Sequence, residues 1–278
     1  VAHVEAGLRS FDLAMPEEIN RMVTDAITDY FFVTEESGRR NLLREGKPKK
    51  DVHFVGHVMI DNLLYQKRKM KNENADSWIP ASAGMTTRNV AMPKGKIATA
   101  PERRFAMTHD LKPENGTYAF MTLHRPSNVD DKKTFMGIAG ALNEIAQDMV
   151  ILFPVHPRTK KMMAQFKIKF SNNIKLLPPL GFKESLFLWK DAKVVFTDSG
   201  GLQEETTALK IPCVTIRENT ERPITVELGT NVLAGTTKAG ILKAYAESLK
   251  KAKQATVPPL WDGKAAERIW KVLTKRER

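Results

Sequence analysis

The chain has little cysteine and no long apolar run among its 278 residues. Its single cysteine, Cys213, excludes an internal disulfide and a cysteine-rich metal site. No apolar run approaches the roughly 18 residues that a membrane-spanning helix needs. The amino terminus also lacks the charged and then apolar pattern of a signal peptide. These absences predict a cytoplasmic protein with no membrane span, no disulfide and no metal centre.

The formal net charge of +12 raises the question of a nucleic-acid partner. Residues 64–113 contain ten Lys and Arg against four Asp and Glu, and residues 243–278 contain the same numbers. These two segments therefore hold the whole excess of positive charge. Because it does not form a basic stripe interleaved with aromatic side chains, the pattern favours a solvated basic periphery and argues against a nucleic-acid partner.

Apolar segments alternate with amphipathic segments from residue 117 to residue 253. The apolar segments predict strands at 117–123, 150–155, 174–180, 193–197, 212–216 and 231–235. The amphipathic segments predict helices at 131–149, 158–170, 184–192, 200–210, 223–230 and 237–253. Such alternation is typical of a parallel sheet with right-handed crossovers, so this part is predicted to be a doubly wound α/β domain.

Residues 1–70 repeat this rhythm over three short strands, with helices after each of them. Three strands make a poor sheet alone, so this part is expected to be the remnant of a larger first domain. Residues 72–105 lack periodicity and carry turn signals throughout. The predicted organisation is therefore a first domain at 1–70, an insertion or linker at 71–113, a second domain at 114–258 and a terminal helix at 259–278.

Polar side chains gather at the points where predicted strands end or helices begin. They are His124, His156, the Ser199-Gly200-Gly201 turn and the 218–222 loop in the second part, and Glu5 and Glu17 in the first. Ligands of doubly wound sheets bind outside the carboxyl ends of the strands. The shared location of these residues therefore predicts one ligand site.

The Ser199-Gly200-Gly201 turn has the chemistry of a phosphate loop. Glycine lets the backbone approach a ligand closely, and the start of a helix presents free N–H groups to an anion. Arg222 on a neighbouring loop offers a permanent cation for a diphosphate, and a carboxylate one turn into the helix, at Glu204 or Glu205, suits the hydroxyl groups of a ribose. An ordinary turn, compensation of the helix dipole or a surface ion pair explains each feature singly. Their combination favours a nucleotide site.

Six motifs occur in this chain in the order in which they occur in the non-hydrolysing UDP-N-acetylglucosamine 2-epimerases. They are "HVEAGLRS" with "MPEEINR", "FVGHVMID", "LHRPSNVDD", "FPVHPR", "TDSGGLQEE" and "TERP". The chain therefore resembles this family over most of residues 1–70 and 114–278. The resemblance implies an α/β fold of the glycosyltransferase-B type with two Rossmann-like domains, the first one incomplete here. It also implies a substrate cleft between the domains and a terminal helix that crosses back to the first domain.

The resemblance assigns a role to each site residue. The catalytic positions are matched by Glu5, Glu17 and His124. The substrate-binding positions are matched by His156, Leu180, Ser185, Ser199, Gly200, Gly201, Glu205 and Arg222. The Ser-Gly-Gly loop and Arg222 are implied to hold the diphosphate, Glu205 the ribose, and the 179–185 segment the uracil. In that segment the family commonly has an aromatic residue where this chain has Ser185.

The implied reaction interconverts UDP-GlcNAc and UDP-ManNAc and requires no metal or redox cofactor. UDP is eliminated across C1 and C2 to give a glycal and is then added back with inversion at C2. Carboxylates with suitable pKa values serve as base and acid, while dipoles and cations hold the departing diphosphate. The family commonly forms homodimers and serves the synthesis of surface polysaccharides.

The family has an amino-terminal stretch ahead of the residues that match here, and it carries further phosphate-binding and catalytic groups. The chain is therefore expected to be amino-terminally truncated, with impaired activity but with UDP binding retained. Two alternatives stay open, namely an inactive UDP-binding relic and a UDP-sugar glycosyltransferase of the same fold, which requires an acceptor. The hydrolysing epimerases, which release free ManNAc, are a further possibility.

Overall fold

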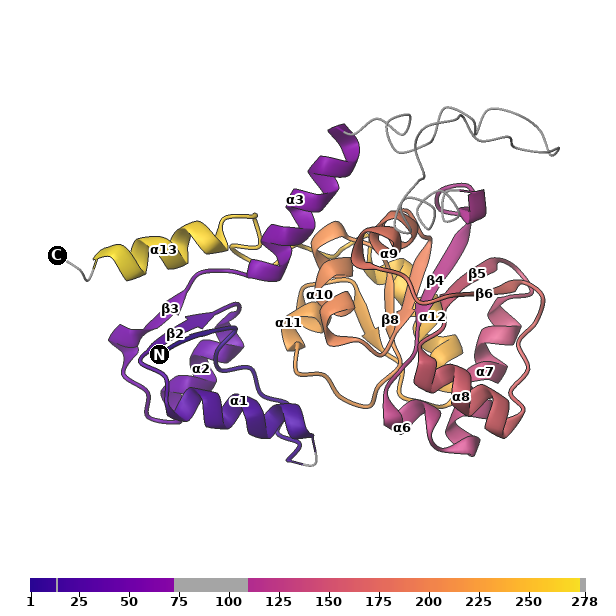
Figure 1. The fold of residues 1–278 in the computed structure, drawn as a ribbon, viewed down its shortest axis with the longest axis horizontal. Coiled ribbons are helices and arrows are strands. Elements are labelled where there is room, and N and C mark those ends of the chain that lie inside the picture. The colour runs from indigo at the N-terminus through magenta and orange to yellow at the C-terminus, as the bar shows by residue number, and fades with distance from the viewer. Residues whose placement is uncertain (14, 73–109, 276–278) are drawn as a thin grey trace, which may run out of the picture.

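The computed structural model describes residues 1–13, 15–72 and 110–275. The first part is a three-stranded parallel sheet with the order β1-β2-β3 (Figure 1). Its elements are β1 (Ala2–Val4), α1 (Pro16–Ala26), β2 (Tyr30–Val33), α2 (Glu36–Arg44), the 3-10 helix η1 (Lys49–Asp51) and β3 (Val52–Phe54). Phe31 and Val33 point to the same face of the central strand and pack with Leu42 of α2. This small core holds α2 against the sheet.

The second part is a six-stranded parallel sheet with the order β6-β5-β4-β7-β8-β9. Its strands are β4 (Tyr118–Thr122), β5 (Val150–Pro154), β6 (Ile174–Leu177), β7 (Val194–Thr197), β8 (Cys213–Thr215) and β9 (Asn231–Leu233). The chain builds outward from β4 in one direction and then outward from β7 in the other. Ligands of such sheets bind outside the carboxyl ends of the strands where the winding reverses, which are β4 and β7 here.

Helices cover both faces of the second sheet, which explains why its central strands are apolar at successive positions. They are α6 (Pro126–Val129), α7 (Lys132–Ile145), α8 (Pro157–Phe166), α9 (Phe182–Trp189), α10 (Gly200–Leu209), α11 (Pro223–Glu227) and α12 (Lys238–Lys251). On β4, Ala119 and Met121 join the core with α7 and α12. Tyr118 and Phe120 point to the other face and join the core with α9 and α10.

Two further helices connect the two parts (Figure 1). α3 (Val58–Asn72) follows β3 directly and buries Ile60 and Leu63 in the core of the second part. α13 (Ala265–Lys275) begins against α3, because the carboxylate of Asp61 accepts hydrogen bonds from the backbone N–H groups of Ala265 and Ala266 at 3.1 and 2.8 Å. An acceptor at this position satisfies helix-start donors that would otherwise have no partner.

The segment ahead of α13 is anchored to the first part of the chain. Trp261 is 3% exposed, and its Nε1–H donates to the carbonyl oxygen of Thr34 at 3.1 Å. Arg268 of α13 donates to the carbonyl oxygen of Val55 at 3.1 Å. The end of the described chain thus packs on residues near its beginning.

The strands and helices predicted from the sequence are confirmed for the described residues, with small shifts at their ends. The sequence did not predict α6 and η1, because such short elements have no detectable periodicity. Most of the predicted insertion at 71–113 lies outside the described residues, and the four domain boundaries stay predictions. Within the described ranges, no helix is both long and apolar enough to cross a membrane.

Gly7→Ala is expected to destabilise the protein much more than Gly46→Ala. Both glycines have a positive φ, 76° and 80°, so alanine strains the backbone by about 1–2 kcal/mol at either position. At Gly7 the added Cβ would also lie 2.2 Å from the carbonyl oxygen of Gly38, whereas Gly46 has open space. Urea unfolding followed by circular dichroism should show a loss at least about 2 kcal/mol larger for Gly7→Ala. Equal losses would contradict this account of the Gly7 packing.

Candidate functional site

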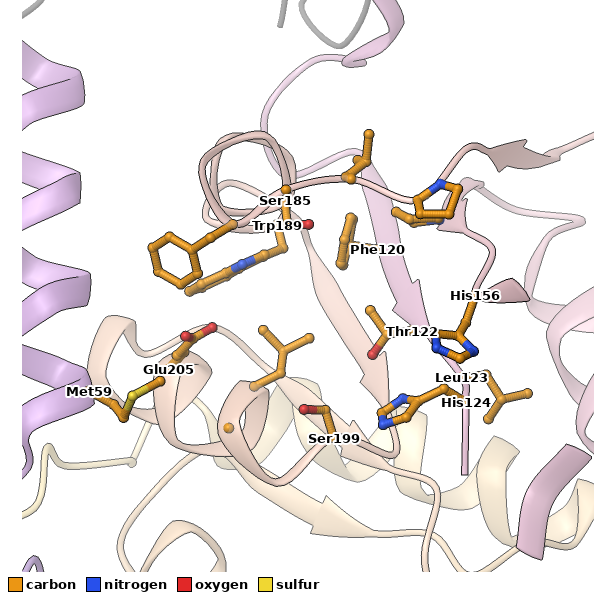
Figure 2. Close-up of a pocket in the computed structure, with 17 residues that line it drawn as sticks. Met59, Phe120, Thr122, Leu123, His124, His156, Ser185, Trp189, Ser199 and Glu205 are labelled. Carbon is orange, nitrogen blue, oxygen red and sulfur yellow. The ribbon is translucent and has the colours of Figure 1, made fainter. Parts of the chain in front are cut away.

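A cavity of about 430 Å³ opens at the carboxyl edge of the second sheet, beside the ends of β4 and β7. Its lining includes the predicted site residues His124, His156, Leu180, Ser185, Ser199, Gly201 and Glu205. Figure 2 shows His124 and His156 next to each other at one end, whereas Glu205 lies toward Met59 and α3. The sheet therefore brings together residues from β4, β5, α9 and α10 as the sequence predicted.

His124 is held by a buried carboxylate that the sequence analysis did not identify. Asp198 follows β7 and is fully buried. Its Oδ1 lies 2.8 Å from Nδ1 of His124, and its Oδ2 accepts the backbone N–H groups of His124 and Arg125 at 2.8 and 2.7 Å. The side-chain amide of Asn128 adds a further contact at 3.2 Å. Asp198 thus fixes both the turn after β4 and the orientation of the imidazole ring.

This arrangement shifts the pKa values of both partners. The hydrogen bond with Asp198 raises the pKa of His124, and the negative charge of Asp198 acts in the same direction. Burial alone would raise the pKa of Asp198, but the contact with His124 outweighs burial and lowers it. The pair therefore favours a positively charged His124 at the end of the cavity.

His156 lies beside His124, with the two ring centroids 5.8 Å apart. It precedes α8, and its Nδ1 accepts the backbone N–H of Arg158 at 3.2 Å. This contact leaves Nε2 of His156 as the protonated nitrogen of the neutral ring. The residue therefore combines a structural role at the start of α8 with a donor at the cavity.

The two glycines at the start of α10 differ in the free space beside their Cα atoms. No heavy atom lies within 4 Å of a Cβ placed on Gly201, apart from its immediate surroundings in the helix. A Cβ placed on Gly200 would lie 2.8 Å from Oε1 of Glu221. The predicted phosphate loop is therefore open toward the cavity at Gly201, whereas the carboxylate of Glu221 lies against Gly200.

Arginine side chains surround Glu221. Arg217 lies 2.8 Å from its carboxylate, and Arg21 of α1 and Arg125 each lie 3.7 Å from it. Burial alone would raise the pKa of Glu221, but the positive charges of Arg217, Arg222 and Arg125 outweigh burial and lower it. Because one carboxylate faces three guanidinium groups, this edge of α10 carries an excess of positive charge.

Glu204 and Glu205 are adjacent in sequence but have opposite environments. Glu204 is 2% exposed; its Oε1 lies 2.8 Å from Nε2 of His57 and 2.7 Å from Nε of Arg222. Burial opposes ionisation of Glu204, yet these two cationic partners lower its pKa. Glu205 lines the cavity, and burial together with the charge of Glu204 raises its pKa to about 7. Of the two, only Glu205 is placed to meet a ligand in the cavity.

Glu5 lies next to this buried charge, on the side of the first part. Oε2 of Glu5 is 3.5 Å from Nη2 of Arg222, and Oε1 is 3.7 Å from Nδ1 of His57. Its φ of 70° is in the left-handed region that residues other than glycine rarely adopt. A strained residue at the end of a strand, with a partly exposed carboxylate, is typical of a functional position.

The structure does not bring every predicted residue to the cavity, because its lining does not include Glu5, Glu17, Gly200 and Arg222. Arg222 is 8% exposed and belongs to the buried cluster of Glu5, His57 and Glu204. Glu17 is exposed in the first turn of α1, whereas its neighbour Glu18 is buried and accepts the backbone N–H of Ser10 at 2.8 Å. Among the described residues, no group of three or more His, Cys, Asp and Glu side chains has the arrangement of a metal site.

Two parallel α/β sheets, with ion pairs between them and a cavity at the carboxyl edge of the second, define a class of protein. It is the class of Rossmann-like two-domain proteins of the glycosyltransferase-B type. This confirms the fold that the sequence resemblance implied.

Comparison with known proteins gives the family. A family model described as UDP-N-acetylglucosamine 2-epimerase matches residues 1–93 and 89–274, and the chain belongs to this family. The UDP-N-acetylglucosamine 2-epimerase of Methanocaldococcus jannaschii is 41% identical over 281 residues, which cover 99% of this chain and 68% of that protein.

Two solved structures of the family are similar to this chain. The crystal structure of the Methanocaldococcus jannaschii enzyme in complex with UDP-GlcNAc and UDP has a TM-score of 0.81 and 39% identity, and the match covers 99% of this chain and 69% of that one. The enzyme of Neisseria meningitidis bound to UDP-GlcNAc has a TM-score of 0.79 and 25% identity, with coverage of 99% and 70%.

Asp198→Asn is expected to lower the pKa of His124 toward its ordinary value of 6.5. The carboxamide oxygen introduced at position 198 can still accept the backbone N–H groups of His124 and Arg125. The carboxamide NH2 group then donates to Nδ1 of His124, which leaves the ring neutral with its proton on Nε2. NMR titration of the histidines measures this change. Asp130→Asn, which removes an exposed carboxylate paired with Arg158, is the control and should leave His124 unchanged.

Stability should change in the same variant. A histidine with a raised folded pKa stabilises the fold fully below its unfolded pKa of about 6.5, and this contribution is lost as the pH rises through the folded pKa. Asp198→Asn should therefore lose about 1.5–3 kcal/mol of unfolding free energy at acidic pH, because hydrogen bonds to a charged group are weakened. An unchanged His124 titration would contradict the assigned role of Asp198.

Proposed function

We propose that this chain binds UDP-N-acetylglucosamine at the cavity and carries out the 2-epimerase reaction between UDP-GlcNAc and UDP-ManNAc. One observation carries the proposal most strongly. The open amide at Gly201, His124 and Glu205 line a single cavity at the carboxyl edge of β4 and β7. The membership of the chain in the UDP-N-acetylglucosamine 2-epimerase family supports the same assignment.

The nucleotide is proposed to lie along the cavity. Leu180, Ser185, Phe120 and Trp189 line the cavity and would take the uracil. Figure 2 shows Ser185, Trp189 and Phe120 on one side of the cavity. Glu205 would accept hydrogen bonds from the two ribose hydroxyl groups. These contacts fix the sugar nucleotide without touching the atoms that react.

The diphosphate is proposed to meet the start of α10. The N–H groups of Gly200 and Gly201 lie at the positive end of this helix, whereas the N–H of Ser199 already donates to Oγ1 of Thr197 at 2.9 Å. His124 and His156 offer further donors at the same cavity. Nε of Arg222 contacts Glu204 of the same helix at 2.7 Å. Such fixed donors stabilise UDP as it departs.

The reaction then needs proton transfer at C2 of the sugar. Glu5 is proposed to take the C2 proton, while the C–H electron pair forms the C1=C2 bond and the C1–O bond breaks to release UDP. The reverse steps reattach UDP at C1 and return a proton to C2 on the other face. Glu17, the second carboxylate assigned by the resemblance, stays a prediction for the acid on that face. The homodimer also stays a prediction, as does the contact of Arg222 with phosphate.

Gly201→Val is expected to weaken UDP binding at least about tenfold, which corresponds to about 1.4 kcal/mol. The added side chain has space in the fold, but it occupies the approach of a phosphate to the helix. Gly137→Ala on α7 is the control, because it also adds atoms to a helical glycine without a close contact and does not line the cavity. Isothermal calorimetry with UDP measures both. Equal affinities of the two variants would contradict the proposed diphosphate position.

Incubation with UDP-GlcNAc in deuterated water tests the chemistry. We expect NMR to show deuterium at C2 and the appearance of UDP-ManNAc. Free ManNAc would instead show the hydrolysing reaction, and UDP binding without deuterium at C2 would show a nucleotide-binding protein and overturn the epimerase assignment.

The affinity for UDP-GlcNAc is expected to rise with pH up to about 7. Ribose hydroxyl groups donate to an ionised carboxylate, and the pKa of Glu205 is raised to about 7. Below this pH the ligand must displace a proton, so affinity should fall by up to about tenfold per pH unit. Glu205→Gln should remove this slope. Glu35→Gln is the control, because burial also raises the pKa of Glu35 to about 7 although it does not line the cavity. A slope that persists in Glu205→Gln would contradict the ribose assignment.

A further inference from the structure

Two carboxylates, a guanidinium group and an imidazole ring lie together where the two parts of the chain meet. Glu204 contacts His57 and Arg222 at 2.8 and 2.7 Å. Glu5 contacts the same two residues at 3.7 and 3.5 Å. The two carboxylates thus lie on opposite sides of the two nitrogen-bearing side chains. Glu5 and His57 come from the first 57 residues, whereas Glu204 and Arg222 belong to the second part.

The two carboxylates differ in their access to solvent. The side chain of Glu204 is 2% exposed and that of Glu5 is 27% exposed. Glu204 is therefore enclosed by its partners, while Glu5 keeps contact with solvent. A buried carboxylate without cationic partners is strongly destabilising, so Glu204 constrains His57 and Arg222 more than the exposed Glu5 does.

The ring of His57 is held from both sides. Its side chain is fully buried, and Nδ1 accepts the backbone N–H of Met59 at 3.2 Å, which satisfies a donor at the start of α3. Nε2 faces Glu204. The edge of the ring also packs on Trp261, with the centroids 5.1 Å apart and the planes at 89°. These contacts leave the ring a single orientation.

We propose that His57 and Glu204 form one buried positioning unit, which fixes the guanidinium group of Arg222 and, through it, the carboxylate of Glu5. This rests on the proposed function, in which Glu5 is the group that reacts with the sugar. Neither His57 nor Glu204 lines the cavity. Arg222 and Glu5 do not line it either, but in the proposed function Glu5 is the group that reaches the sugar. His57 and Glu204 then act through Arg222 and Glu5, and they are positioning residues.

The unit also gives adjacent residues of α10 separate tasks. Successive residues of a helix point about 100° apart. Glu205 therefore faces the cavity proposed for the nucleotide, whereas Glu204 faces His57 and Arg222. Substitution of Glu205 should therefore weaken nucleotide binding, whereas substitution of Glu204 should mainly slow the proton transfer at C2. This difference separates the two carboxylates experimentally.

The titration of His57 is a direct readout of the unit and requires no activity. Burial lowers the pKa of His57, but the negative charges of Glu204 and Glu5 outweigh burial and raise it, while Arg222 opposes them. Glu35 on the β2–α2 connection interacts with both Glu204 and Arg222. Glu221 interacts with the same two residues, and Glu205 interacts with Glu204 and His57. Trp261, the remaining neighbour from the segment before α13, carries no charge.

NMR titration of the full chain tests the unit first. Glu204→Gln should lower the pKa of His57, while Glu205→Gln should lower it much less, because Glu204 is the main carboxylate that raises it. An unchanged His57 titration in a folded Glu204→Gln variant would overturn the proposal. Because loss of a buried charge can prevent folding, His57→Asn is the second variant. Asparagine can still accept the N–H of Met59 and donate to Glu204, but it carries no charge.

Kinetics of deuterium incorporation at C2 then test the consequence. His57→Asn and Glu204→Gln should each lower kcat at least about tenfold with a smaller change in KM, and His57→Asn should also change the pH profile of kcat. Glu205→Gln should instead raise KM. Unaltered kcat and pH profile in His57→Asn would overturn the proposal. If the unsubstituted chain incorporates no deuterium, the proposed function fails, yet the His57 titration still decides whether the unit exists.

Discussion

The site depends on the order in which the chain adds strands to the second sheet. From β4 it adds strands on one side, and from β7 it adds them on the other side. Two parallel strands that begin opposite halves of a sheet leave an opening at their carboxyl ends, because their crossover helices lie on opposite faces. His124 follows one of these strands and Ser199 follows the other, so both reach the same cavity. The apolar strand interiors fix this register, since a shift by one residue would turn Phe120 from one buried face to the other.

Strand ends were therefore the part of the site that the sequence could predict. His124, His156, Ser199 and Gly201 each follow an apolar segment directly, and parallel topology brings such positions together. The same pattern of alternating segments predicted the elements of the fold closely. The resemblance to a family added Leu180, Ser185 and the choice of Glu205 over Glu204, which periodicity alone left open.

The partners of these residues could not be predicted in the same way. Asp198 is adjacent to Ser199 in sequence, but its contact with His124 joins residues 74 positions apart. A single polar residue after a buried strand was the only available signal for it. Glu204 was predicted only as an alternative ribose-binding carboxylate, and its pairing with His57 could not be predicted, because that pairing depends on how the first part packs against the second. The sequence pattern around a strand predicts which side chains lie at its end. The charged partners of those side chains come from distant parts of the chain and are known only from the folded structure.

The hydrogen bond from Trp261 to Thr34 has a consequence for how the protein is made. Its two ends are separated by 227 residues, and a ribosome adds roughly 5–20 residues per second. At this rate, Trp261 is synthesised on the order of 10–45 s after Thr34, and until then the first sheet lacks this anchoring contact. During that interval the β1–β3 sheet depends on its own small core, so this part of the nascent chain is where chaperone binding and proteolytic loss would concentrate.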